Sequence, residues 1–121
     1  MLEAKAHLDE IKSSCQASDG ESLKLIKETL KETYRYFTGN DNFNEEIWIK
    51  RYYQLGNRLA FLYKLKENGY NVKLILLNIV GDFTYKMNTQ EEWDNYYKQV
   101  FYKMLGTIGV PENVDIVNVI V

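Results

Sequence analysis

Glu3 and Lys5 are the residues whose types and spacing could do chemistry, because an acid and a lysine two apart on an extended segment project from one strand face. A hydrolytic site can hold a divalent metal with one such side chain and an attacking water with the next. Glu3 would supply a hard oxygen ligand for Mg²⁺, and the carbonyl of Ala4 a second. The Lys5 ammonium could orient water or stabilise the charge that develops on a phosphate. The alternative is an edge strand with two solvated charges, since Glu-x-Lys is frequent by chance.

The rest of the chain predicts the elements that position these two residues. Residues 1–8 alternate apolar and polar, which predicts a strand with one buried face. Two helices are expected over 18–39 and 44–68, the first opened by a capping box and each ended by a glycine. Residues 72–80 form a nearly continuous apolar run, which is typical of a strand buried on both faces.

A second capping box at Thr89 opens an amphipathic helix that should end at Gly106. Residues 114–121, which are β-branched except for Asp115 and Asn118, predict a final strand. The order β-α-α-β-α-β predicts one domain, residues 1–121, with an α/β fold. Helices are expected to cover a small, mostly parallel or mixed sheet, giving three layers.

A polar stripe runs along the otherwise apolar segment 44–68 and includes Arg51, Gln54, Asn57 and Arg58. Buried polar groups need partners, which a metal-bound water network or a phosphate backbone would provide. The alternative is an ordinary solvent-facing stripe, with the internal Gly56 letting another element approach closely.

Two further residues are weaker site candidates. His7 alternates onto the face of Glu3 and Lys5, although a hydrogen-bonded or solvated histidine at a strand end is the commoner case. Asp82 follows the apolar strand, and ligands of open α/β sheets bind beyond the carboxyl ends of strands. A turn or capping aspartate is the alternative for Asp82.

Three segments taken together resemble the C-terminal half of a PD-(D/E)XK nuclease-like domain, which has the restriction-endonuclease-like fold. They are Leu2-Glu-Ala-Lys-Ala-His7, the helix with Tyr-Tyr-Gln54-Leu-Gly-Asn57-Arg58, and the apolar strand ending in Val80-Gly-Asp82. In that family a strand carries Glu-x-Lys, a following helix often points a Gln toward the metal, and another strand runs alongside. The family's metal-binding Asp sits on an earlier strand, whereas only Met1 precedes the motif here. The chain therefore resembles a partial core lacking the first helix and two strands.

The resemblance implies metal-dependent phosphodiester hydrolysis of nucleic acid, in an active, degenerate or inactive form. Glu3, Lys5 and Gln54 would be catalytic, Glu3 would bind Mg²⁺ or Mn²⁺, and Arg51, Asn57 and Arg58 would contact nucleic acid. The alternative is a non-catalytic binding or assembly domain that retains the fold. DNA and RNA remain equally open as substrates.

Composition limits the partners and the cellular location that the sequence allows. The net charge of −2 argues against a protein that coats nucleic acid, yet an acidic total is compatible with a metal-dependent nuclease. The sequence predicts no membrane span and no signal peptide, and its single Cys15 favours the cytoplasm. An N-terminal strand with an unpaired edge, in a chain with 10 Tyr, predicts a homo-oligomer, with a dimer as the commonest closed form.

Overall fold

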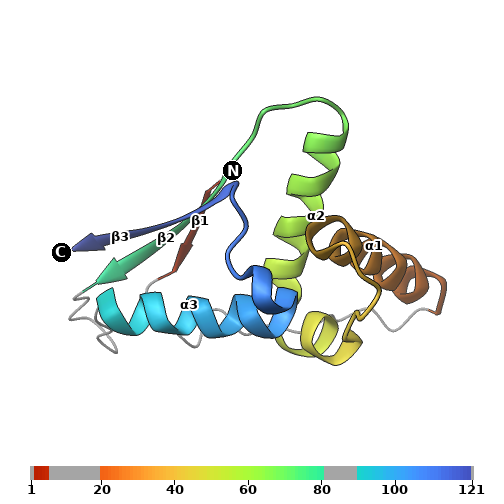
Figure 1. The fold of residues 1–121 in the computed structure, drawn as a ribbon, viewed down its shortest axis with the longest axis horizontal. Helices are drawn as coiled ribbons and strands as arrows, with labels where there is room; N and C mark the ends of the chain where they lie inside the picture. The colour runs from red at the N-terminus through yellow and green to blue at the C-terminus, as the bar shows by residue number, and fades with distance from the viewer. Residues whose placement is uncertain (1, 6–19, 81–89, 121) are drawn as a thin grey trace.

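The computed structural model describes residues 2–5, 20–80 and 90–120 (Figure 1). The elements follow in the order β1 (Leu2–Lys5), α1 (Gly20–Thr38), η2 (Glu46–Arg51), α2 (Tyr53–Glu67), β2 (Leu74–Val80), α3 (Gln90–Leu105), η3 (Gly106–Ile108) and β3 (Val114–Ile120). Here η2 is a π-helix and η3 a 3₁₀-helix. The predicted order of strands and helices is confirmed, and the chain is a small mixed α/β fold.

The three described strands form one parallel sheet in the order β1-β2-β3, with β2 in the centre. The register sets Leu2 beside Ile75 in the first pair and Leu74 beside Val114 in the second. Parallel neighbours need long crossovers, and the helices between successive strands belong to these connections. Strand β2 begins at Leu74, two residues after the predicted start at Val72, and residues 1 and 6–8 of the first predicted strand lie outside the described residues.

Helix α1 follows its apolar period and ends where a glycine was expected. Leu30 and Tyr34 are buried, and Leu23, Ile26 and Phe37 pack partly against the core. Gly39 has φ +73° and donates its backbone N–H to the carbonyl of Arg35 at 2.8 Å. Glycine adopts this left-handed conformation at little cost, which is why it terminates helices.

The prediction of one continuous helix over 44–68 is wrong, because the segment breaks at Tyr52. The backbone N–H of Tyr52 donates to the carbonyl of Ile47 at 3.0 Å, an i→i+5 bond that makes η2 a wide π-type turn. Tyr52 itself leaves helical geometry, with φ −126° and ψ 45°, and α2 starts at the next residue. Apolar residues lie on nearly all sides of this segment, so its hydrophobic pattern does not reveal the change from the π-helix η2 to the α-helix α2.

The far end of α2 forms a Schellman-type cap. Gly69, with φ +87°, donates its N–H to the carbonyl of Lys66, and Tyr70 donates to the carbonyl of Leu65, both at 3.0 Å. The predicted glycine terminator at this position is confirmed. Gly106, with φ +69°, follows the last residue of α3 in the same way.

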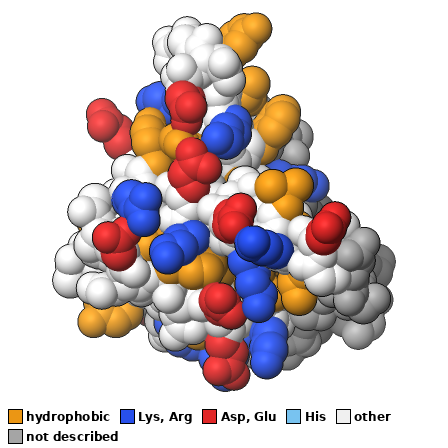
Figure 2. All heavy atoms as spheres, turned by 90° about the vertical axis from the view of Figure 1, so that its right-hand side faces the viewer, with side chains coloured by type: hydrophobic (Ala, Val, Ile, Leu, Met, Phe, Trp, Pro, Cys, Tyr) orange, Lys and Arg blue, Asp and Glu red, His pale blue; other side chains and the backbone are white. Residues whose placement is uncertain are grey.

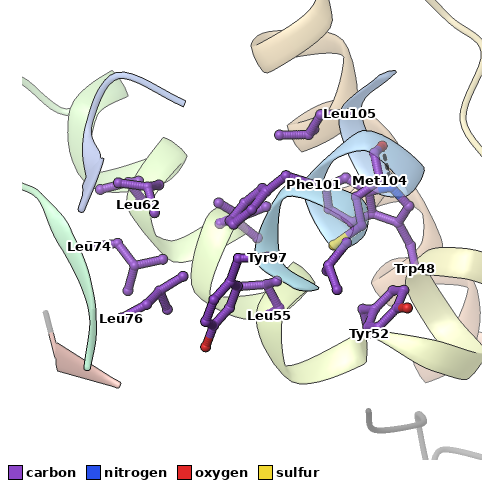
Figure 3. Close-up of a cluster of buried hydrophobic side chains, with 14 of the residues drawn as sticks. Trp48, Tyr52, Leu55, Leu62, Leu74, Leu76, Tyr97, Phe101, Met104 and Leu105 are labelled. Atoms are coloured by element: carbon purple, nitrogen blue, oxygen red, sulfur yellow. Dashed lines mark hydrogen bonds between the residues drawn. The ribbon is translucent and has the colours of Figure 1, made fainter. Parts of the chain in front are cut away.

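The core lies where α2 and α3 meet the sheet and where η2 meets the end of α3 (Figure 3). Leu62 of α2 lies near Leu74 and Leu76 of β2, while Tyr97 and Phe101 of α3 fill the middle of the cluster. The rings of Trp93, Tyr97 and Phe101 follow one another along α3, with centroids about 6 Å apart. The apolar face of the predicted amphipathic helix is therefore buried core.

The two faces of the sheet differ in the described part of the chain. Leu74, Leu76 and Asn78 alternate along β2 and are at most 1% exposed. On the opposite face Ile75 and Leu77 are only partly buried, and Val117 and Val119 of β3 are 40% and 41% exposed. The expectation that β2 is buried on both faces is therefore wrong for the described residues, because their helices pack on one face only (Figure 1).

Candidate functional site

Strand β1 places Glu3 and Lys5 against the central strand of the sheet. The register sets Glu3 level with Leu76 and Lys5 level with Asn78. The prediction that both residues lie on one strand, paired in parallel with the later apolar strand, is confirmed. Lys5 thus lies beside the carboxyl-terminal half of β2, the half of a parallel strand near which α/β proteins bind ligands.

A chain of polar side chains crosses the sheet at this level. Asn78 of β2 is fully buried, and its Nδ2 donates to Oδ1 of Asn118 on β3 at 3.3 Å. Nδ2 of Asn118 donates in turn to Oδ1 of Asp94 on α3 at 3.0 Å. The three residues join the central strand, the outer strand and the covering helix.

One acceptor in this hydrogen-bond network, Oδ1 of Asn78, has no partner among the described residues. The buried Oδ1 of Asn78 receives no hydrogen bond from the described residues. An unpaired buried acceptor destabilises the folded state by about 1–3 kcal/mol. Such an acceptor therefore indicates either a missing donor or a functional role.

Sequence reasoning did not single out Asn78, Asn118 or Asp94 as site residues. The available signal was an asparagine within a mostly apolar strand, first at 78 and again at 118. A polar residue inside a buried strand must find a hydrogen-bond partner, so the two interruptions indicate facing positions on neighbouring strands. The register confirms that these two asparagines are directly paired.

The predicted polar stripe is divided by the break at Tyr52. Arg51 is exposed at the end of η2, and Gln54 is exposed in the first turn of α2. Asn57 and Arg58 are partly buried on α2. The stripe is therefore not one row on one helix, and these residues lie at or near the surface, as the solvent-facing alternative expected.

Gly56 lets another element approach α2 closely, as the solvent-facing alternative expected. A Cβ at this position would lie 3.0 Å from Cε3 of Trp48 and 3.6 Å from a methyl carbon of Leu30. The missing side chain thus lets the indole ring pack directly on the backbone of α2.

Charges of both signs are mixed over the side of the molecule on which α1 lies (Figure 2). Lys27 pairs with Glu45 at 3.2 Å, and Arg35 pairs with Asp41 at 2.6 Å. All four side chains are more than one third exposed, and such pairs add little stability. This side offers no extended surface of one sign to a polyanion.

A buried tyrosine links α1 to α2 through carboxylates. The Tyr63 hydroxyl donates to Oε1 of Glu32 at 2.8 Å, and Lys64 reaches the same oxygen at 3.4 Å. Hydrogen bonds to the carboxylates of Glu67 and Glu32 raise the pKa of Tyr63 above its usual range. The bond from Tyr63 in turn lowers the pKa of Glu32. These shifts belong to a helix-to-helix contact on the other side of the core from β1.

A metal centre cannot be assembled from the described side chains alone. Those residues contain no group of three or more His, Cys, Asp or Glu side chains placed to hold an ion. His7, Cys15 and Asp82, and the capping residues Ser18 and Thr89, lie outside the described residues.

The site residues therefore fall into two groups. Glu3 and Lys5 share β1, and Lys5 is level with Asn78 of the Asn78–Asn118–Asp94 chain, whereas Gln54, Asn57 and Arg58 lie on α2. Within the described part of the chain no helix is long and apolar enough to cross a membrane. No family model, curated protein or solved structure matches the chain.

Proposed function

We propose that this chain is a PD-(D/E)XK nuclease-like domain whose chemistry is metal-dependent hydrolysis of phosphodiester bonds in nucleic acid, in active or degenerate form. The observation that carries the proposal is the pairing of the Glu3-x-Lys5 strand, in parallel, with a central apolar strand. The β-α-α-β-α-β order supports it. The three-layer, partial restriction-endonuclease-like core, with a further layer over the open sheet face, is part of the same proposal.

Each candidate residue receives a role from its chemistry. Glu3 would hold Mg²⁺ or Mn²⁺ through a carboxylate oxygen. Lys5 would orient the attacking water or stabilise the charge on the phosphate. Gln54, on α2, would supply a neutral hydrogen-bonding group. Because the described side chains do not form a complete ligand set, the metal proposal rests on Glu3, with Asp82 and His7 as weaker candidates.

Arg51, Asn57 and Arg58 would bind the phosphate backbone. Their exposed or partly buried positions near the start of α2 leave them open to solvent, as such contacts require. The mixed charges over the α1 side favour this narrow group over a broad basic surface, so we expect few phosphate contacts and a shallow salt dependence.

A metal-binding measurement distinguishes the proposed nuclease from a non-catalytic binding or assembly domain. Titration calorimetry with Mn²⁺ should give a binding isotherm for the wild-type chain that Glu3→Ala abolishes. Glu91→Ala, which removes an exposed carboxylate from α3, is the matched control and should bind as wild type does. Equal binding by wild type and Glu3→Ala would remove Glu3 as a ligand.

Cleavage of supercoiled DNA and of single-stranded RNA then tests the chemistry. Lys5→Met should lower the metal-dependent rate by on the order of 100-fold, while Lys98→Met, on the exposed side of α3, should not. Arg58→Ala should weaken nucleic-acid binding, with Arg35→Ala as the exposed control.

A non-catalytic binding or assembly domain is the second candidate. The open sheet face favours it, because Val117 and Val119 are well exposed on β3, an edge strand of the sheet that the described residues form. Exposed apolar faces of this kind are typical of association surfaces. A chain that binds no metal and cleaves neither substrate, but associates with itself or a partner, would establish this candidate instead.

A further inference from the structure

The end of α2 carries the only Asn-Gly pair in the sequence, Asn68–Gly69. Both residues are exposed, at the point where the chain leaves α2 and turns toward β2 (Figure 1). An asparagine side chain can react with the backbone nitrogen of the next residue. The reaction is fastest before glycine, because glycine has no side chain to hinder the approach. The pair therefore has the chemistry of a spontaneous deamidation site.

The backbone of Asn68 holds the reacting groups apart. A five-membered ring closes only when the nitrogen of Gly69 is rotated to eclipse Cβ of Asn68, on the side of the amide. With ψ 11°, this nitrogen nearly eclipses the backbone nitrogen of Asn68 instead. The ring therefore cannot close until the bond between Cα and the carbonyl carbon of Asn68 rotates.

Hydrogen bonds to the helix end oppose this rotation. The N–H of Gly69 donates to the carbonyl of Lys66 at 3.0 Å. Nδ2 of Asn68 donates to the carbonyl of Lys64 at 2.8 Å. The attacking nitrogen and the nitrogen that would leave are thus each bonded to α2, and both bonds must break before the ring forms.

We propose that Asn68–Gly69 is a self-modification site that the C-terminal cap of α2 protects, so that the chain deamidates there when the helix end opens. The backbone nitrogen of Gly69 then forms a bond to Cγ of Asn68. The bond from Cγ to Nδ2 breaks, and ammonia leaves with the proton of the Gly69 N–H. One water molecule opens the resulting succinimide. Opening at Cγ gives aspartate, and opening at the main-chain carbonyl gives isoaspartate.

Either product weakens the cap. Aspartate adds a negative charge at the C-terminus of α2, where the helix dipole disfavours it. Isoaspartate also routes the main chain through Cβ, which adds one atom to it and displaces the N–H of Gly69 from the carbonyl of Lys66. The reaction therefore turns a transient opening of the helix end into a permanent change beside the segment that leads into β2.

Peptide mapping of the full chain measures the reaction directly. Trypsin releases residues 67–73, and mass spectrometry of this peptide during incubation at neutral pH follows the mass gain of deamidation. The free peptide 67–73 in the same buffer gives the rate without the helix. We expect Asn68 to react about tenfold more slowly in the full chain than in the free peptide. Asn71 is an internal control, because Val72 hinders attack there.

Variants separate the cap from the reacting pair, each compared with a free peptide that carries the same change. Tyr70→Pro removes the N–H that Tyr70 donates to the carbonyl of Leu65 at 3.0 Å, so deamidation of Asn68 should accelerate several-fold. Tyr70→Ala keeps this N–H and removes an exposed ring, so it should react as wild type does. Asn68→Gln, whose longer side chain closes a ring far more slowly, should give no product at position 68.

The protective cap and the reacting pair can each be refuted. A full chain that reacts as fast as its peptide, or equal rates in Tyr70→Pro and Tyr70→Ala, would overturn the role of the cap. Faster reaction at Asn71 than at Asn68 in the free peptide, or undiminished product in Asn68→Gln, would overturn the site. Circular dichroism shows whether each variant is folded, and if Tyr70→Pro is not, the comparison of the wild-type chain with its peptide decides.

Discussion

The indole nitrogen of Trp48 donates a hydrogen bond of 3.0 Å to the carbonyl oxygen of Met104 (Figure 3). Met104 lies in the last turn of α3, where backbone carbonyls have no partner inside the helix. The bond therefore caps α3 and ties it to η2, 56 residues earlier in the chain. Contacts with the rings of Tyr34 and Phe43 confine the indole further.

The confined indole makes Gly56→Ala destabilising. The new methyl would lie 3.0 Å from Cε3 of Trp48, which cannot retreat without loss of its bond to Met104. Overpacking costs about 1–3 kcal/mol and the helix gains about 1 kcal/mol from alanine, so we expect a net loss of about 1 kcal/mol in urea unfolding. Gly20→Ala, with no atom within 4 Å, should lose nothing. Equal losses at both positions would show that the indole does move aside.

The fold was predictable where a local rule acts alone. Gly39, Gly69 and Gly106 end their helices because a left-handed residue is needed there. The apolar run before Val80 predicted a strand, and the two-residue spacing of Glu3 and Lys5 predicted another, which the structure pairs with it. These signals depend on short stretches of sequence and need no knowledge of the tertiary structure.

The remainder depends on contacts between distant residues. The break at Tyr52 accompanies the packing of Trp48 against Gly56 and Met104, which the hydrophobic pattern does not encode. The coupling of Asn78 to Asn118 depends on the register of β2 and β3, which follows from the completed sheet. The open sheet face was missed because an apolar strand reads alike whether one or both faces are covered.

The two asparagines should show strong energetic coupling. Asn118→Leu leaves the buried amide nitrogen of Asn78 without an acceptor, and we expect a loss of about 1–3 kcal/mol in unfolding free energy. The double variant Asn78→Leu/Asn118→Leu removes both polar groups and should lose less than the sum of the single losses. A double-mutant cycle by urea unfolding measures the difference, and strictly additive losses would contradict the coupling.

The contact between Tyr63 and Glu32 should stabilise the fold in a pH-dependent way. The phenol lowers the pKa of Glu32, so the stabilisation is complete above the usual value of 4.5 and is lost as pH falls through the lowered value. The same hydroxyl also donates to a carboxylate oxygen of Glu67. The gap in unfolding free energy between wild type and Tyr63→Phe should therefore shrink from pH 7 to pH 3. Tyr36, whose ring lies against that of Tyr63, is the control, and the gap in unfolding free energy between wild type and Tyr36→Phe should stay constant with pH. A pH-independent gap for Tyr63→Phe would contradict the proposed role of Glu32.

We expect self-association through the outer edge of β1, which ends the described sheet and has one strand neighbour there. Unpaired strand edges pair with further chains, and two-fold pairing would bring two Glu3-x-Lys5 strands together and supply a second carboxylate. Sedimentation at tens of micromolar should show a species of twice 14.3 kDa. Val117→Lys places a charge on the open sheet face and leaves β1 unchanged, so the dimer should persist. Loss of the dimer in this variant would show that the interface is the open sheet face instead. A single monomeric species of wild type would refute both the dimer and the completion of the site by a second chain.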